Sequence, residues 1–477
     1  MKKIIAIVIS LISFCSYTQE IVKSVDLAIS KNAEVFQVVE DDKKQVSLFF
    51  SARINVLAIR FDENFNVIDS LKAPKPSKEK YDDIVGYSVS GNKYYAYWSS
   101  SNGKELLAQG FDFDTKNVTS KTISIPLEKE KIIKKITVNN VFYIVSILKH
   151  TGILNFYVMR DGELEKQSVD LTSKRFLSKN DNATTLWDLV SSSTSFETPY
   201  SFQTISTETP PSLALSANKH KIYVLGNKLL FTLDDNTRFT QTLTIDLIDF
   251  SATTKMVPQP AFNGESDIYA YDSNSFLLDG KIIQMKNNSD LMKITVKDME
   301  DHKIKEFLIN NQEISFKNSE INQENGSAKS LRILDKSSQL LRKISGTNPA
   351  ISLYEANQKI YMIIGGVSNV QQNNAMMFGG MYGMSGVLIG MALSSNYSLN
   401  NLNSYKQRKV VYINCLFDKD FNHLDGEVKR TAFDELRVFS ETKTDLIAPV
   451  LFRLNSNLYY AGFDKYVGNY IFYKFKD

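Results

Sequence analysis

The four histidines are the side chains of this chain best suited to proton transfer or to metal binding near neutral pH. His150, His220, His302 and His423 lie far apart in the sequence, and no two of them have the spacing of metal ligands. Each stands beside an expected turn or a charged loop. A surface or capping role is therefore predicted for all four, and no metal site is predicted.

Two carboxylates, Asp112 and Asp114, stand two positions apart, so a strand would place them on one face for acid–base chemistry or calcium binding. Asp62, Asp418 and Asp420 occupy matching positions after other apolar runs. A strand that ends in a polar turn explains all five positions. The turn is preferred over a site for this reason, and no catalytic residue is predicted.

Familiar catalytic motifs are absent, since the sequence has no H-E-x-x-H, no G-x-S-x-G, no P-loop and no paired cysteine motif. Cys415 lies in an apolar run, 410–417, and is expected to be a small buried side chain. The formal net charge is only +3, and no basic stripe suggests nucleic acid. The chain is predicted not to be an enzyme and to need no cofactor. A hydrolase with residues scattered over several repeats is the alternative.

Residues 1–18 have the layout of a signal peptide, with two lysines before an apolar run. That run, 4–14, is too short to span a bilayer stably. Cleavage is expected to leave Gln19 as the first residue. Lipidation at Cys15 is the alternative, although the bulky Phe14 precedes it where that processing requires a small residue.

Residues 19–477 are too many for one compact core of the usual size. They show an imperfect repeat in which two apolar strands and an alternating strand are separated by tight polar turns. Early copies recur at about 48 residues, which suits a four-stranded propeller blade. The predicted fold is all-β, a single β-propeller of about seven blades, and a pair of β-sandwiches is the alternative. Strands are expected at 45–50, 55–61 and 66–71; 92–98, 105–113 and 119–125; 141–148, 154–159 and 166–171; 221–225, 228–233 and 241–248; 276–278, 281–285, 290–296 and 305–309; 359–364 and 409–417; and 458–463 and 469–475.

The last copy reaches the end of the sequence without an outer strand. Residues 23–27 supply a spare strand that echoes 167–171, an outer strand of the third copy. An N-terminal strand paired with the last copy would close the ring and remove two free sheet edges. Chance similarity between two short strand-forming segments is the alternative.

Four aromatic side chains gather in one expected strand, at Tyr94, Tyr95, Tyr97 and Trp98. They could line a carbohydrate-binding face. Their alternating positions favour packing between blades instead.

Three insertions interrupt the repeats, at about 172–219, 312–340 and 366–408. The first is rich in Ser and Thr, and we expect an irregular surface loop with one short helix at about 183–190. The second is polar and charged, and we expect a loop or a short helix. The third is named the Met/Gly excursion.

The Met/Gly excursion (366–408) is unusual in composition. No charged residue and no histidine occurs from 360 to 405, and five of the twelve methionines fall within 376–391 together with five glycines. A single membrane crossing conflicts with the repeats, because the chain must return to form the strand at 409–417. No transmembrane span is therefore predicted in the mature chain.

The excursion could fold over one face of its own ring, insert into another protein, or touch a membrane surface. Methionine adapts to a partner surface and glycine permits close approach of the backbone. An exposed uncharged patch of this size is also an aggregation hazard unless something covers it. Under the second interpretation the partner-binding residues are Met376, Met377, Phe378, Met381, Tyr382, Met384, Val387, Leu388, Ile389 and Met391.

The leader that ends before a glutamine and the Lys/Asn/Ile-rich composition resemble those of exported Bacteroidota proteins. A propeller with one uncharged insertion also resembles the plug-protein family of the type 9 secretion translocon. This resemblance implies a periplasmic protein that binds an outer-membrane protein and occludes its pore. No separate C-terminal sorting domain follows the last repeat, which favours the periplasm over the cell surface. A glycan- or peptide-binding propeller module is the alternative function.

Overall fold

The chain divides into two compact units, and the computed structural model describes residues 19–192, 197–262, 271–325, 331–368, 397–405 and 409–476. The first unit combines residues 1–75 with 429–477, and the second comprises 76–428. Both are built from small sheets that are almost entirely antiparallel, so the all-β prediction is confirmed. The predicted signal peptide lies outside the described residues, and the single-domain assignment stays a prediction.

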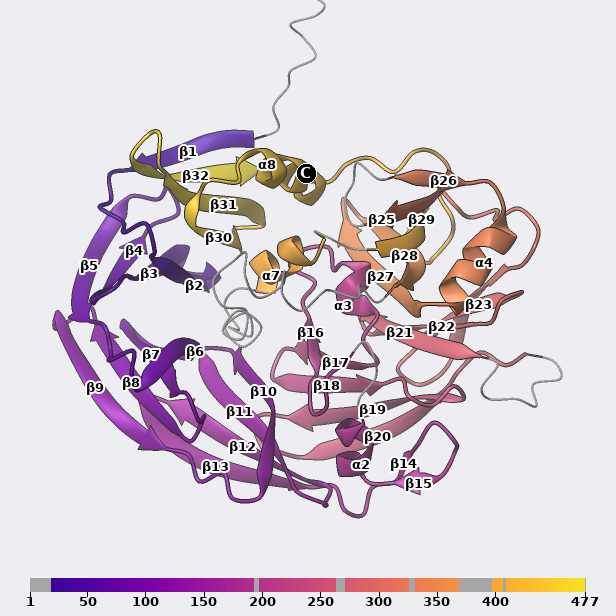
Figure 1. Ribbon diagram of the computed structural model, residues 1–477, viewed down its shortest axis with the longest axis horizontal. Helices are drawn as coiled ribbons and strands as arrows, with labels where there is room; N and C mark the ends of the chain where they lie inside the picture. Colours follow the sequence, from indigo (N-terminus) through magenta and orange to yellow (C-terminus); the bar gives the residue numbers. More distant parts are fainter. Residues whose placement is uncertain are drawn as a thin grey trace, which may run out of the picture. The chain divides into compact units, whose positions relative to one another are not determined.

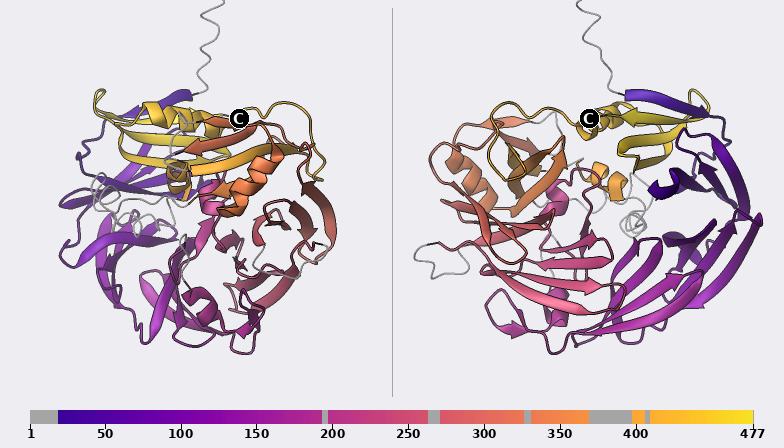
Figure 2. Two further views of the ribbon diagram at one scale, coloured as in Figure 1. Left: turned by 45° about the vertical axis from the view of Figure 1, so that its right-hand side comes forward. Right: turned by 180° about the vertical axis from the view of Figure 1, so that it is seen from behind.

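The described part of the first unit contains two four-stranded sheets, one α-helix and a short 3-10 helix at Asp41–Lys43. The helix α8 (Ala432–Thr442) packs Phe439 against Tyr473. The N-terminal strand pairs with the C-terminal one, from Gln19 opposite Phe475 to Val25 opposite Tyr470. The predicted pairing is confirmed, but the strand covers 19–25 instead of the expected 23–27. Figure 2 shows this indigo strand beside the yellow C-terminal strands. The strands are β2 (Glu34–Glu40), β3 (Gln45–Ser51), β4 (Asn55–Phe61) and β5 (Val67–Pro74) in one sheet, and β1 (Gln19–Val25), β32 (Asn469–Phe475), β31 (Asn457–Asp464) and β30 (Ile447–Leu454) in the other.

The core of this unit lies between its two sheets and is rich in aromatic rings. Phe65 follows β4 and stacks on Phe472 of β32 with ring centroids 4.3 Å apart. Phe61 and Phe472 meet edge to face at 5.4 Å. Such pairs add to the free energy that the buried ring area already contributes.

In the described part of the second unit, five sheets of four or five strands follow one another along the chain (Figure 1). Consecutive sheets pack through their apolar faces; Phe156 on the second of them, for example, meets Phe250 after β19 of the third. The strands are β6 (Tyr81–Ser90), β7 (Lys93–Ser100), β8 (Glu105–Asp112) and β9 (Asn117–Ser124); β10 (Glu130–Val138), β11 (Val141–Leu148), β12 (Ile153–Arg160) and β13 (Glu163–Asp170); β16 (Gln203–Ile205), β17 (His220–Leu225), β18 (Lys228–Leu233), β19 (Phe239–Asp246) and β20 (Ala252–Pro258); β21 (Asp272–Leu278), β22 (Lys281–Asn287), β23 (Met292–Asp298) and β24 (Lys303–Ile309); and β26 (Arg332–Leu334), β25 (Ile321–Asn325), β29 (Lys409–Phe417), β28 (Lys359–Val367) and β27 (Asn348–Ala356).

Strand β7 carries the four aromatic residues that the sequence singled out, and all four are buried. Tyr97 stacks on Phe142 of the neighbouring sheet at 5.3 Å, and its hydroxyl lies 2.8 Å from Ser88 Oγ. A Cβ at Gly86 would approach Phe142 to 2.1 Å, so only glycine fits beneath that ring. Packing between sheets is confirmed, and Cys415 on β29 is likewise buried as expected.

The first insertion is not the surface loop that its composition indicated. It forms the hairpin β14 (Phe176–Leu177) and β15 (Ala183–Thr184), the helices α2 (Leu186–Ser191) and α3 (Leu213–Ser216), and β16, which pairs parallel to β17. Leu186, Trp187 and Phe202 are buried in the core. These apolar residues are scattered among Ser and Thr in the sequence. Their burial holds the insertion in place. The expected helix starts at Leu186 because Thr185 caps it.

The sequence predicts a loop or a short helix for the second insertion. A short helix is present at its end, but the strands β25 and β26 were not expected. Strand β25 pairs with β29, so a segment that precedes β27 in the sequence supplies the strand beyond β29. Helix α4 (Ser337–Ser345) then buries Leu340, Leu341 and Ile344. The strand Ile-Asn-Gln-Glu-Asn is polar at most positions, so it left no hydrophobic signal.

Candidate functional site

Both ends of the Met/Gly excursion emerge from neighbouring inner strands of one sheet, at the same end of those strands. Strands β28 and β29 are paired antiparallel up to Val367 opposite Val410, and Ser368 N–H donates to Lys409 O at 2.9 Å. The chain therefore leaves this sheet and re-enters it at the same place. The ten predicted partner-binding residues, 376–391, lie outside the described residues.

Two glycines let β28 approach its neighbours closely just before the excursion. A Cβ at Gly365 would lie 2.1 Å from Val411 O, and one at Gly366 would lie 2.2 Å from Thr347 Oγ1. Both distances are far inside van der Waals contact, so larger residues would force the strands apart. The departure point of the excursion is thus a tightly packed part of the sheet.

The return end is held by helix α7 (Tyr397–Ser404), which docks on the first insertion (Figure 1). Asn401 is buried; its Oδ1 accepts from Ser212 N–H at 3.0 Å, and its Nδ2 donates to Thr209 Oγ1 at 2.9 Å and to Pro210 O at 2.6 Å. Tyr405 hydroxyl donates to Pro210 O at 3.0 Å. Sequence reasoning missed this helix because its buried contacts are polar.

A small apolar cluster joins the two ends of the excursion to α3. Leu213 and Ala217 pack with Val367, Val410 and Ala350. Ser352 Oγ also donates to Pro211 O at 2.6 Å, which ties the Pro-Pro segment to β27. One sheet and the first insertion therefore hold both ends of the excursion in place.

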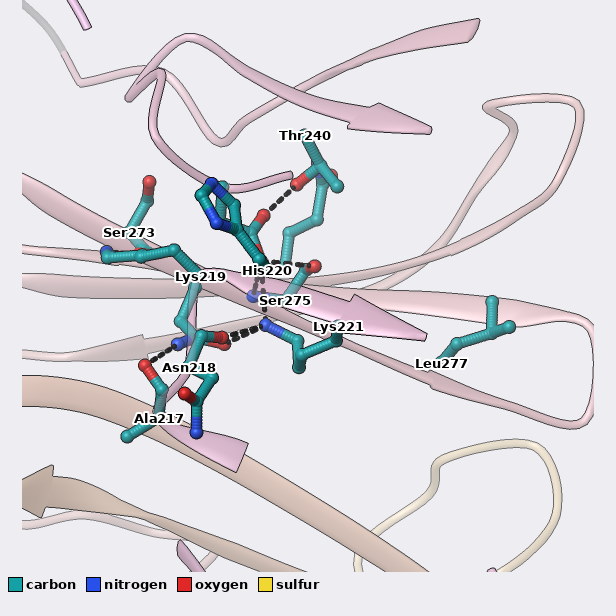
Figure 3. Close-up of polar contacts among 12 residues, drawn as sticks. Ala217, Asn218, Lys219, His220, Lys221, Thr240, Ser273, Ser275 and Leu277 are labelled. Carbon is teal, nitrogen blue, oxygen red and sulfur yellow. Dashed lines mark hydrogen bonds and ion pairs between the residues drawn. The ribbon is translucent and has the colours of Figure 1, made fainter. Parts of the chain in front are cut away.

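A second candidate site is a buried charged network at the start of β17, drawn in Figure 3. The side chains of Lys221 and Asp234 have no exposed surface, and Lys221 Nζ lies 2.9 Å from Asp234 Oδ2. Asp234 also accepts from Thr240 Oγ1 and from Ser275 Oγ, each at 2.8 Å. Burial lowers the pKa of Lys221, and the Asp234 carboxylate opposes that fall.

Two further ion pairs flank this network. Lys219 Nζ lies 2.5 Å from Asp272 Oδ1, and His220 Nε2 lies 2.8 Å from Asp235 Oδ2. Burial opposes the charge on both cations, but Asp272 and Asp235 raise the pKa of Lys219 and of His220 above their ordinary values. Burial likewise opposes the charge of Asp235, whose pKa His220 nevertheless lowers.

The surface role predicted for His220 is therefore wrong. Its strand begins inside the packed first insertion, where Phe202 lies against the imidazole ring at 5.4 Å. His150 and His302 are exposed, as predicted, and His423 is half-buried and within 3.1 Å of Asn318 Oδ1.

The turn interpretation of the strand-end aspartates is confirmed. Asp112 Oδ1 accepts from the N–H groups of Asp114 and Thr115, each at 3.0 Å, and Thr115 keeps the pKa of Asp112 below its usual value. Asp62 and Asp418 accept from backbone N–H groups two and four residues ahead in the same way. Among the described residues, no group of three or more His, Cys, Asp or Glu side chains could hold a metal ion.

A cavity of about 440 Å³ opens beside the charged network. One wall comes from the starts of β17, β21 and β27 and from the residues that follow β18. The other comes from the β14–β15 hairpin and α2. Its lining residues are Ser178, Lys179, Asn180, Thr184, Asp188, Leu189, Ser192, Glu197, Ala217, Lys219, Asp235, Asp272 and Asn348.

No helix in the described parts of the chain has the length and apolar character needed to span a bilayer.

No protein-family model and no curated protein matches the sequence. Solved structures that resemble the chain include an ACO/RPE65 chimera (8% identity, 57% of this chain and 58% of that chain, TM-score 0.27). AofleA from Arthrobotrys oligospora is 8% identical over 74% of this chain and 83% of its own, with a TM-score of 0.23. One prolyl endopeptidase structure is 8% identical over 70% of this chain and 46% of its own, with a TM-score of 0.25. Likeness at this level assigns neither a family nor a function.

Proposed function

We propose that the chain is a non-enzymatic interaction protein of the periplasm that inserts the Met/Gly excursion into an outer-membrane protein. A secretion pore is the partner that such an insertion would plug. The observation that carries the proposal is the anchoring of both ends of the excursion side by side, by the β28–β29 pairing and by the buried Asn401. A long uncharged segment presented from a rigid base can enter a partner without loss of the fold that carries it.

The proposed scaffold is a propeller of seven blades closed by β1. Its support is the succession of seven sheets of four or five strands in the described residues, and the pairing of β1 with β32. A closed ring would leave the excursion on one face of a stable platform. A cryo-electron microscopy map of the protein would count the blades directly.

Deletion of 370–396, with a short Gly/Ser linker in their place, tests the function while α7 keeps its contacts. Co-purification with the outer-membrane partner from detergent-solubilised envelope is expected to be lost, because the deletion removes every predicted contact residue. The matched control replaces 263–270 in the same unit with a Gly/Ser sequence of equal length and should co-purify normally. If the deletion variant still co-purifies with the outer-membrane partner, the proposal is refuted.

A further inference from the structure

We infer that the cavity beside His220 binds a small molecule that carries a primary ammonium group. The cavity is separate from the excursion mount, and the inference does not depend on the proposed function. Its volume of about 440 Å³ lies within the usual range for small-molecule sites.

The outer wall of the cavity is held in place before any ligand arrives. Gln241 clamps the backbone of Leu177, with its Oε1 accepting from Leu177 N–H at 2.7 Å and its Nε2 donating to Leu177 O at 2.8 Å. Asn236 Nδ2 donates to Ser178 O and to Asp181 Oδ1, each at 2.8 Å. Gln241 and Asn236 are themselves buried. A wall fixed in this way adds little ordering cost to binding.

The inner wall is fixed by the ion pairs of Lys219 and His220. A chain that needed only stability could fill this space with apolar side chains, which are often as stabilising as buried ion pairs. Here polar groups instead line an open hollow; Glu197 is buried, and Lys219, Asp235 and Asp272 are partly exposed. This arrangement suits a site that recognises a polar ligand.

The charge of the lining selects the ligand. Among the described residues its carboxylates outnumber its lysines by two, and His220, which pairs with Asp235 behind the wall, reduces the excess to one negative charge when its imidazole is protonated. A ligand with one positive charge would make the site neutral, and in a partly desolvated hollow that compensation is strongly favoured. The charged groups of the lining are Asp188, Glu197, Asp235 and Asp272 against Lys179 and Lys219.

Asp235 is the carboxylate best placed to receive the ammonium group. It lines the cavity, its side chain is 16% exposed, and its Oδ2 is held by His220, which orients the carboxylate. The hairpin wall opposite contains Ser178 and Thr184, whose hydroxyls suit the hydroxyl or amide groups of the same ligand.

Titration calorimetry at mildly acidic pH tests the inference with two probes, glucosamine and leucinamide. Each is compared with its N-acetyl counterpart, in which the charge is removed and the rest of the molecule is kept. At least one probe should bind, and acetylation should weaken it about tenfold or more, equivalent to about 1.4 kcal/mol. Binding of glucosamine would indicate a sugar-like ligand, and binding of leucinamide would indicate an amino-acid-like ligand. Absence of binding by both probes, or equal binding of the acetylated forms, would overturn the inference.

Two variants place the binding in this cavity. Asp235→Asn removes the negative charge but keeps an oxygen that can pair with His220. The affinity for the probe should fall about tenfold. Ser192 is exposed on the rim of the cavity, so Ser192→Trp should block entry of the probe. The ion pairs of Lys219 and His220 should stay in place. The matched control is Asp279→Asn, the same change at a carboxylate that is 77% exposed and outside the cavity, and it should bind normally. Normal binding by either cavity variant would overturn the assignment.

Discussion

At the scale of single residues, the ion pair of His220 and Asp235 makes stability depend on pH. Burial opposes the charge, yet Asp235 raises the pKa of His220 above 6.5. Because the pKa of His220 is higher in the folded state, its ion pair stabilises the fold fully below pH 6.5. This stabilisation is lost as the pH rises through the pKa of the folded state. The lowered pKa of Asp235 affects the stability only in acid, below pH 3.8. The free energy of unfolding is therefore expected to fall as the pH rises above about 6.5.

Urea denaturation across this pH range measures the effect, with His220→Gln for comparison. The glutamine variant should be less stable at the acidic end and should show a flatter dependence, because it has no proton to lose. His302→Gln is the matched control, since His302 pairs with Asp298 at an exposed turn where solvent screens the charge. A slope that is unchanged in His220→Gln would contradict the assignment.

Residue types alone predicted the turn aspartates but not the state of His220. Asp112 and Asp418 accept hydrogen bonds from N–H groups two to four residues ahead, so the local sequence contains the whole interaction. The partner of His220 is Asp235, fifteen positions along the chain and across a hairpin. Burial of that pair depends on Phe202 from the first insertion, which composition had indicated to be a surface loop.

At the scale of elements, several of the strands that were missed from the sequence are bulged. Strand β6 shifts register between Tyr81 and Asp83 and between Ile84 and Gly86, and β10 shifts between Ile132 and Lys134. Each bulge reverses the side-chain alternation that identifies a strand. The first strands β2, β6, β10, β27 and β30 were all overlooked, whereas tight turns located the strands that follow them.

Helix α7 should depend on Asn401 more than on its own propensity to be helical. Eight residues rich in Asn and Ser do not form a stable isolated helix. Asn401→Ala removes the acceptor for Ser212 N–H and the donor to Thr209 and Pro210, so buried polar groups lose their partner at a cost of about 1–3 kcal/mol. Hydrogen exchange of 397–405 should become faster by about tenfold or more.

The control is Asn400→Ala on the same helix, at a position that is only half-buried. This change raises helix propensity and breaks none of the contacts with the first insertion, so exchange should stay the same or become slower. Equal acceleration in both variants would show that α7 is not held by Asn401.

At the scale of the whole molecule, composition and turn chemistry were enough to predict an all-β chain. The pairing of β1 with the last strand was also predictable, because an incomplete final repeat and a spare first strand complement each other. The origin of the strand beyond β29 was not predictable, since β25 comes from a polar insertion before the strands it joins. Long-range pairing of this kind leaves no periodic pattern in its own segment.

The strand β1 protects the edge of the C-terminal sheet, and its removal should affect stability and association together. Deletion of 19–25 exposes the backbone of β32 and removes Val22 and Val25, which are partly buried against the core of this unit. An uncovered edge next to apolar side chains pairs readily with other chains. We expect a melting temperature lower by several degrees and concentration-dependent oligomers in size-exclusion chromatography. Ile21→Ser is the control, because that side chain is 62% exposed and its loss should change stability by no more than about 0.5 kcal/mol. A truncated chain that stays monomeric and melts with the full-length protein would show that β1 is dispensable, and ring closure by this strand would then lose its support.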